Sequence, residues 1–409
     1  MHVPFPPPRA DADWITCVYS IASKLLYHAV DLTPKTTDGD ESEDEAEGTD
    51  ASVESSALKR AKSFYETVST RPALAALIMS LKIGGQTFLG QASLDPRAFI
   101  THSFLCIAIL RYCTRVENLF ISQIAEIHKR HLLTELQLLK RLRVLDVGSH
   151  CSSKPGVAIF DFSDCQELSR GPALQTIGFN WTGLTRMHPS SLVASPAIRR
   201  LDLYKVAMTD SQFVATMAWV GPTLETLFVG QEISGGFDGL QPWSVTYTGL
   251  QAGLSHLKAL EHLHLDFTQD YGQIDLSATS ATLLTPLRKL RTVYVTPDTF
   301  PYTGLGHLAS PYLQKFHLYV FSGISYPPID EVALSAGVEA MIRTPAICPS
   351  IVTISHRIVE MAAGYDEDGE IEWEADFPAP RPLGAEIVDR LTARCAAAGV
   401  RFVYTPRSV

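Results

Sequence analysis

Residues 224–229 read LETLFV, and residues 260–265 read LEHLHL. Both stretches place large apolar residues at the first, fourth and sixth positions, as in Leu260, Leu263 and Leu265. The last two of these are two positions apart, which is the spacing of side chains on one face of a β-strand. The first lies where the chain turns into the strand, so we expect its side chain to be buried as well. Each stretch therefore predicts a strand with one buried face.

The same spacing occurs nine times along the chain. The copies are Ile78/Leu81/Ile83, Val116/Leu119/Ile121, Leu142/Leu145/Val147, Leu174/Ile177/Phe179, Ile198/Leu201/Leu203, Leu224/Leu227/Val229, Leu260/Leu263/Leu265, Leu290/Val293/Val295 and Leu313/Phe316/Leu318. Successive copies begin 38, 26, 32, 24, 26, 36, 30 and 23 residues apart. Regular leucine-rich repeats recur about every 20–29 residues. The pattern is therefore typical of a leucine-rich-repeat solenoid with insertions in some repeats.

Segments between the copies have helical patterns. Residues 124–140 carry a mostly apolar face, Asp210 is a candidate N-cap of a helix that stops at Gly221-Pro222, and residues 329–342 form a third segment. A closing unit is expected over residues 384–404, where a helix leads through Gly399 into a strand. We predict an α/β fold: an irregular leucine-rich-repeat solenoid with parallel strands on the concave face and helices or loops on the convex face. The alternative is a set of unrelated buried strands in an α/β domain.

The net charge of −10 is concentrated near the N-terminus. Residues 38–50 contain eight acidic residues and no basic one, so the rest of the chain carries only −10 + 8 = −2. A segment this acidic and this poor in apolar residues is expected to be disordered. We therefore predict three regions: an N-terminal cap (residues 1–34), an acidic disordered insertion (35–62) and the solenoid (63–409).

The composition argues against several classes of protein. No apolar run approaches the roughly 18–20 residues of a membrane span, and the first eight residues do not resemble a signal peptide. The seven cysteines include no C-x-x-C pair, and no basic face indicates nucleic acid. We expect a cytoplasmic or nuclear protein that binds neither membranes nor nucleic acids.

No motif for catalysis or for a cofactor is present. The sequence lacks the phosphate-binding loop, the G-x-S-x-G elbow and the H-E-x-x-H zinc motif. Residues 364–371 partly imitate a calcium loop, but they lack the acidic first and twelfth positions, so a hairpin turn at Asp368-Gly369 is the better interpretation. His128 and His131 are three apart on an expected helix, where a surface position explains them. We predict no enzyme, no metal site and no cofactor.

Side chains that alternate with the buried positions are expected to line the opposite face of the strands. Many of them are aromatic, His or Arg, which are residues typical of protein interfaces. The candidate protein-binding residues are Phe120, Arg200, Asp202, Tyr204, Phe228, His262, His264, Tyr294, His317 and Tyr319. The alternative is that strands favour aromatic residues in general.

Three segments resemble fungal F-box proteins with degenerate leucine-rich repeats. Residues 21–32 resemble the stretch directly after the F-box, and residues 64–68 and 71–83 resemble the next element, in which a helix precedes a strand. The resemblance implies that the repeats select a protein substrate for a cullin-type ubiquitin ligase, to which the F-box docks through an adaptor. Only thirteen residues precede Trp14, so we expect the F-box itself to be missing or truncated.

The function we expect is non-catalytic protein–protein recognition by a substrate receptor of this kind. Its partner would lie on the concave face, and the ubiquitin-ligase adaptor is a second possible partner. One alternative is a free-standing repeat scaffold with no ubiquitin link. A further alternative is an unrecognised hydrolase or a regulator of an enzyme.

Overall fold

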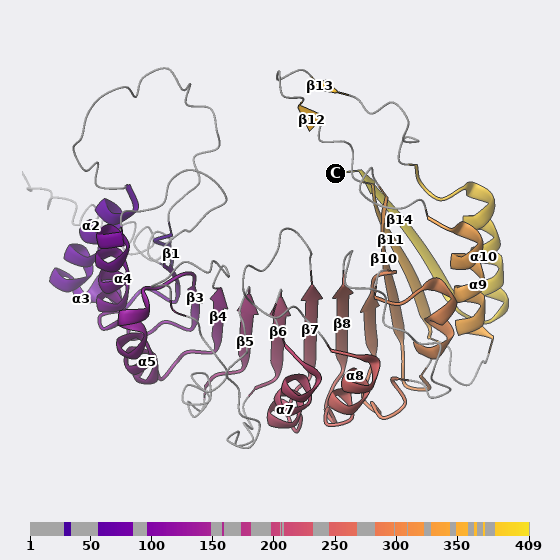
Figure 1. Cartoon of the computed structure of the whole chain (residues 1–409), viewed down its shortest axis with the longest axis horizontal. Coiled ribbons are helices and arrows are strands. Elements are labelled where there is room, and N and C mark those ends of the chain that lie inside the picture. Colours follow the sequence, from indigo (N-terminus) through magenta and orange to yellow (C-terminus); the bar gives the residue numbers. More distant parts are fainter. Residues whose placement is uncertain are drawn as a thin grey trace, which may run out of the picture. The chain divides into compact units, whose positions relative to one another are not determined.

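The computed structural model divides the chain into two compact units (Figure 1). Unit 1 comprises residues 1–184 and 238–240, and unit 2 comprises residues 185–237 and 241–409. The structure describes residues 28–33, 56–84, 96–148, 158, 173–180, 198–204, 206, 208–231, 245–267, 283–297, 299–308, 310–322, 329–343, 349–358, 364–365, 371–372 and 381–408.

Five parallel strands and the helices between them build unit 1. In neighbour order the strands are β1 (Ala29–Asp31), β2 (Ser80–Ile83), β3 (Asn118–Ile121), β4 (Val144–Gly148) and β5 (Thr176–Asn180). The helices are α2 (Ser56–Thr70), α3 (Pro72–Ala75), α4 (Pro96–Leu110), η1 (Glu126–His128) and α5 (Lys129–Leu138). The described connections from β1 to β2, from β2 to β3 and from β3 to β4 thus contain helices, which are the usual crossovers between parallel strands.

Unit 2 continues the same architecture with seven strands. They are β6 (Arg200–Tyr204), β7 (Thr226–Gln231), β8 (His262–Phe267), β9 (Thr292–Val295), β10 (Lys315–Ser322), β11 (Ile351–Ile358) and β14 (Arg401–Ser408). Every pairing within this set is parallel. The helical elements are α7 (Asp210–Val220), α8 (Tyr247–Leu254), η3 (Tyr302–Leu308), α9 (Glu331–Ile342) and α10 (Ala385–Ala397), and they lie on one side of the strands (Figure 1). The expected α/β fold with parallel strands is confirmed.

The nine apolar copies build the core. All of their residues are buried, none with more than 5% of its surface exposed. The strand register brings equivalent positions together, since Leu227 pairs with Leu263, Leu263 with Val293 and Val293 with Phe316. Equivalent apolar residues of successive copies thus lie side by side on neighbouring strands. Together they form a continuous apolar core that one strand and one helix could not bury alone.

Two strands of the parallel sheet in unit 2, β11 and β14, have no counterpart among the nine copies, and only β14 was expected, as the end of the closing unit. Strand β11 pairs with β10 so that Val352 lies opposite Phe316 and Ile354 opposite Leu318. The position equivalent to Leu313 is Pro349, which is not a large aliphatic residue, so the three-residue pattern is broken. Parallel pairing with β10 therefore places β11 in the sheet, although its own sequence lacks the complete apolar pattern.

The helix over residues 210–220 forms as expected, but its cap differs. Thr209, not Asp210, is the N-cap: its hydroxyl accepts from the Gln212 backbone N–H, and the Gln212 side chain accepts from the Thr209 backbone N–H. This reciprocal capping box satisfies two backbone donors at once. Asp210 is instead the first helical residue, and its carboxylate accepts from the backbone N–H and hydroxyl of Thr246.

The expected helix over residues 124–140 is shorter than its pattern. A 3-10 turn, η1, precedes α5, and Leu132 and Leu136 are buried as expected. Ile127, however, is 62% exposed, because it lies in η1 and not on the buried face of α5. The change of helix type rotates its side chain away from the core.

At the N-terminus the structure describes residues 28–33 and then resumes at residue 56. Helix α2 begins at Ser56, within the stretch assigned to the acidic insertion, and buries Leu58 and Ala61. Residues 56–62 of the predicted insertion are therefore helical, while the domain boundaries themselves stay a prediction. The acidic stretch 38–50 lies outside the described residues.

At the C-terminus the closing unit is confirmed. Helix α10 ends near Gly399, whose φ of +74° suits a glycine, and the chain enters β14. Two short antiparallel strands, β12 (Gly364–Tyr365) and β13 (Ile371–Glu372), flank the expected turn at Asp368-Gly369. The turn residues themselves lie outside the described residues.

Candidate protein-interaction surface

The side chains that alternate with the core of unit 2 lie on the face of the sheet away from the helices, which we call the open face. Strand pairing places Phe228, His264, Tyr294 and His317 at one level on four neighbouring strands. Tyr204 and Tyr319 lie two residues further along their own strands. These six residues, all partly exposed, are here called the ring row.

The rings of this row contact one another in sequence. Their centroid distances are 6.3 Å for Tyr204–Phe228, 4.5 Å for Phe228–His264, 5.3 Å for His264–Tyr294 and 4.4 Å for Tyr294–His317. Tyr319 lies 5.8 Å from His264 and 6.0 Å from Tyr294. These distances fall within the range of favourable aromatic pairs. The ring row is thus a continuous aromatic surface that crosses five strands, β6 to β10.

Gly230 makes room for two of these rings. A Cβ atom at this position would lie 2.7 Å from a ring carbon of Tyr204 and 2.8 Å from one of Phe228. Strand β7 therefore leaves one position of the open face without a side chain. The neighbouring rings cover it.

An ion pair lies at one end of the row. The Arg200 Nε donates to both carboxylate oxygens of Asp202, at 3.0 and 2.8 Å. Burial raises the pKa of the Asp202 carboxyl, and the hydrogen bond and charge of Arg200 oppose this increase. The two side chains are two residues apart on β6, so a single strand presents the pair.

His264 lies at the centre of the row and is uncharged at neutral pH. Burial lowers its pKa to about 4, and the positive charges of Arg200 and His317 contribute. Its Nε2 atom is buried and has no hydrogen-bond partner within the described part of the chain. A buried nitrogen without a partner costs stability, and such atoms are uncommon in folded proteins.

Burial also shifts the pKa values of His317 and Tyr319 in the ring row. Burial, and to a smaller extent Lys315, lower the pKa of His317. Burial raises the pKa of Tyr319, with contributions from Tyr294 and Asp266, whereas Arg407 acts in the opposite direction. Both residues are therefore neutral near pH 7, and the row presents a largely uncharged aromatic surface.

Eight of the ten candidate residues belong to the ring row or to the ion pair beside it. His262 is exposed and shares a level with Arg200 and Lys315 at the amino-terminal ends of the strands. Phe120 lies in unit 1, on the corresponding face of β3. The sequence analysis did not include Arg357, Arg401 and Arg407, because β11 has no copy of the apolar pattern and β14 was considered only as the end of the closing unit.

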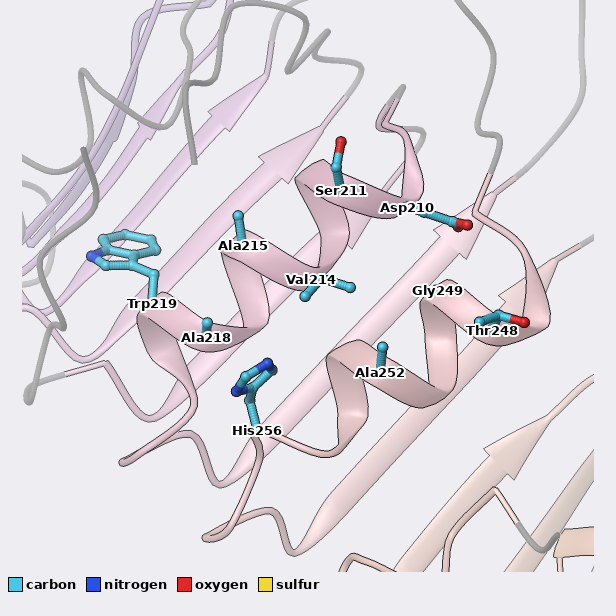
Figure 2. A pocket seen from close by; sticks show the side chains of 10 residues that line it. All are labelled: Asp210, Ser211, Val214, Ala215, Ala218, Trp219, Thr248, Gly249, Ala252 and His256. Atoms are coloured by element: carbon cyan, nitrogen blue, oxygen red, sulfur yellow. The ribbon is translucent and has the colours of Figure 1, made fainter. Parts of the chain in front are cut away.

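A second surface feature lies on the helical side of unit 2. An open groove of about 800 Å³ separates α7 and α8 (Figure 2). Small side chains, Ala215, Ala218 and Ala252, form much of its lining. The Asp210 carboxylate at one end is held by Thr246. His256 also lines the groove, so its titratable side chains are Asp210 and His256.

A hydrogen-bonded cluster of three polar side chains links three strands of unit 2. His356 of β11 lies with its Nε2 2.7 Å from the Ser322 hydroxyl of β10 and its Nδ1 2.9 Å from the Tyr404 hydroxyl of β14. The Tyr404 hydroxyl also accepts from the Leu383 backbone N–H at 2.9 Å. His356 is only 1% exposed, and burial lowers its pKa. A serine beside a histidine can act as a nucleophile, but this pair lies in the packed core, where it satisfies buried polar groups.

Within the described ranges, no group of three or more His, Cys, Asp or Glu side chains could hold a metal ion. Nor does any helix among these residues have both the length and the apolar character needed to cross a bilayer. His128 in η1 and His131 in α5 lie with ring centroids 6.1 Å apart, and both ring nitrogens of His128 are buried, so the expected surface position does not hold for His128.

Two solved structures are among those similar to this chain. A chain of the Rad7 and Elc1 complex in yeast has a TM-score of 0.35 and 12% identity, with 85% of this chain and 94% of that chain covered. A chain of the TLR13–ssRNA13 complex has a TM-score of 0.37 and 13% identity, with 70% of this chain and 40% of that chain covered. No protein-family model matches the sequence, and no curated protein matches it. The fold is leucine-rich-repeat-like, and its strand pairings carry that assignment.

Proposed function

We propose that the chain is a non-catalytic protein-recognition module that binds its partner through the open face of unit 2. The observation that carries this proposal is the ring row, in which six partly exposed rings contact one another across five adjacent strands. Aromatic residues and arginine dominate the energetically important positions of protein interfaces. Their stacking also holds the side chains in place, so little conformational entropy is lost when a partner binds.

The finer proposal is that the partner is a substrate of a ubiquitin ligase. It rests on the resemblance of residues 21–32, 64–68 and 71–83 to F-box proteins with degenerate repeats. Under this proposal the residues after the acidic insertion select the substrate, and an adaptor binds near the N-terminus. A free-standing scaffold without a ubiquitin link is the alternative, and a hydrolase or an enzyme regulator is the third candidate. The protein would act in the cytoplasm or nucleus.

The test uses variants at the two ends of the ring row. Replacing the interior residues Phe228 and His264 would also remove several ring contacts and lower stability. Tyr204→Ala with Tyr319→Ala removes exposed aromatic surface and leaves the central stack intact. A matched control replaces Tyr312 and Val332, which are 45% and 73% exposed and lie outside the open face.

The measurement is affinity purification of the full chain from its own cells, followed by quantitative mass spectrometry. We expect a defined set of partners to be lost with the Tyr204→Ala/Tyr319→Ala variant and retained with the control. Adaptor and cullin peptides among the partners would support the ubiquitin-ligase proposal, and other partners alone would support the scaffold. Retention of every partner by the open-face variant would refute the proposal, and turnover of a substrate panel by the purified chain would support the enzyme candidate.

A further inference from the structure

Strands β11 and β14 add basic side chains to the open face of unit 2. Arg357 and Arg407 are direct partners across the β11–β14 pairing, and Arg401 pairs with Ile351, which in turn pairs with Lys315. All four basic residues are exposed, and among the described residues none of them forms an ion pair. We call Lys315, Arg357, Arg401 and Arg407 the basic strip.

Packing of the sheet does not explain why four basic side chains, without ion-pair partners in the described part of the chain, lie on β10, β11 and β14. Like charges directly opposite each other on neighbouring strands are destabilising, so the Arg357–Arg407 pair opposes folding. By contrast, Arg199 and Arg200 on the other side of unit 2 each have a carboxylate partner, at 2.6 and 2.8 Å. Two guanidinium groups on adjacent strands provide a row of planar donors, which is the geometry that carboxylates bind best.

The basic strip adjoins the ring row. Arg357 is the pairing partner of both Phe321 on β10 and Arg407 on β14, so these three side chains share one level of the sheet. Tyr319 lies two residues before Phe321 on the same strand, and Arg407 is near enough to influence its ionisation. A partner that extends across the sheet from β8 to β14 would therefore contact aromatic rings first and guanidinium groups next.

The charges along the rest of the face favour a protein segment over a nucleic acid. Asp202 lies beside the ring row on β6, at the end away from the basic strip. Asp266 lies on β8, in the middle of the row, and is near enough to Tyr319 to influence its ionisation. A phosphate backbone that followed the rings would meet both carboxylates, and repulsion would oppose its binding. A protein segment can carry its acidic residues at one end only, and so match the strip without this penalty.

We propose that the basic strip binds an acidic segment of the protein partner, with the carboxylates of that segment on Arg357 and Arg407 and its adjacent apolar or aromatic side chains on His317 and Tyr319. This inference rests on the function proposed above and adds the chemistry and the polarity of the partner. Charge-assisted hydrogen bonds to guanidinium groups would fix the direction in which the segment crosses the strands.

The test is a fluorescence-anisotropy titration of the full chain with defined probes. The acidic probe is a labelled peptide of about twelve residues, long enough to cross these strands at about 3.3 Å per residue, with Glu and Asp at one end and Phe and Leu at the other. A second peptide replaces each acid by its amide, and a third probe is a single-stranded RNA of comparable length. We expect binding of the acidic peptide alone, with an affinity that falls as salt is added.

Variants locate the site. Arg357→Gln with Arg407→Gln should weaken the acidic peptide by about tenfold or more, since each residue loses a charge-assisted hydrogen bond. The matched control, Arg343→Gln with Arg390→Gln, removes the same charge from exposed positions at α9 and α10 and should stay within about twofold, because exposed charges far from the site are screened. The melting temperature of each variant shows that it folds. If the first pair does not fold, the single variant Arg407→Gln takes its place, with Arg390→Gln as its control.

Three results would overturn the inference: equal weakening in the control pair, equal binding of the amide peptide, or tighter binding of the RNA. The proposed function is tested separately by the Tyr204→Ala/Tyr319→Ala purification. If cellular partners depend on the ring row but not on Arg357 and Arg407, the recognition function stands and the acidic-segment inference fails. If partners depend on neither set of residues, both fail.

Discussion

The two units share one kind of buried face but differ in what their open faces present. In unit 1, equivalent positions on four neighbouring strands carry Lys82, Phe120, Asp146 and Gly178. In unit 2, equivalent positions carry Asp202, Phe228, His264, Tyr294 and His317. A single ring between two charged side chains offers no continuous apolar surface, whereas the ring row does. The buried side thus fixes the fold, while the open side is free to vary and can specify a partner.

The buried faces should respond alike to loss of apolar volume. Leu119→Ala in unit 1 and Leu263→Ala in unit 2 each remove a side chain with no exposed surface. We expect each to lower the free energy of unfolding by about 2–5 kcal/mol, because a cavity adds to the lost transfer energy. Urea denaturation measures the effect. A much smaller loss at Leu119 would show that unit 1 is less tightly packed than unit 2 and would break the comparison.

The open faces should respond differently to loss of a ring. Tyr294 contacts His264, His317 and Tyr319, at centroid distances of 5.3, 4.4 and 6.0 Å. Tyr294→Ala should therefore lower the free energy of unfolding by about 1–3 kcal/mol, at about 0.5–1.5 kcal/mol per favourable ring pair and without full additivity.

The control for this experiment is Phe120→Ala in unit 1. Phe120 is 36% exposed. Its removal should change the free energy of unfolding by less than about 1 kcal/mol, as is typical at exposed sites. Equal losses from the two variants would indicate that the ring contacts of unit 2 contribute no stability of their own.

Acid should destabilise the ring row through His264. Its pKa is about 4 in the folded protein, below the ordinary value of about 6.5 expected in the unfolded chain. Between these values the unfolded chain binds a proton that the folded chain does not, so stability falls as the pH is lowered from 6.5 to 4 and is unaffected above that range. The slope for one proton is at most about 1.4 kcal/mol per pH unit.

His264→Phe tests this linkage, because phenylalanine keeps the ring and removes the proton. We expect a flatter decrease in the free energy of unfolding between pH 6.5 and 4 than in the wild-type chain, as measured by urea denaturation at several pH values. The pKa of His317 is also lowered, so some pH dependence should persist in the variant. Identical pH profiles for the variant and the wild-type chain would contradict the assignment.

The smallest expected effect comes from Gly230. In Gly230→Ala the new methyl group would press on the rings of Tyr204 and Phe228. We expect a loss of about 1 kcal/mol, at the low end for added volume, because ring edges can turn aside. A change in near-UV circular dichroism should accompany it. In unit 1, Gly178→Ala meets the Asp146 carboxylate at 2.9 Å and no ring, so it should leave the aromatic spectrum unchanged.

Much of this architecture could be predicted from local pattern. The nine apolar copies gave the strands and their buried sides, and the rule that alternate side chains face opposite ways gave the candidate residues. The helix cap at Thr209 was misassigned because Thr and Asp are adjacent and both favour caps. Strand β11 was missed because Pro349 occupies its first apolar position. Arg357 was missed with it, whereas Arg401 and Arg407 were missed because β14 was considered only as the end of the closing unit.

By itself the sequence determined which side chains are buried and which face outward, because a period of two is a local property of an extended chain. It could not decide which outward side chains become neighbours. Only the tertiary structure places His264 between Phe228 and Tyr294, and Arg357 opposite Arg407. Register depends on pairing between strands about 20 to 50 residues apart, through loops of irregular length, and a shift of one residue would turn every side chain to the other face.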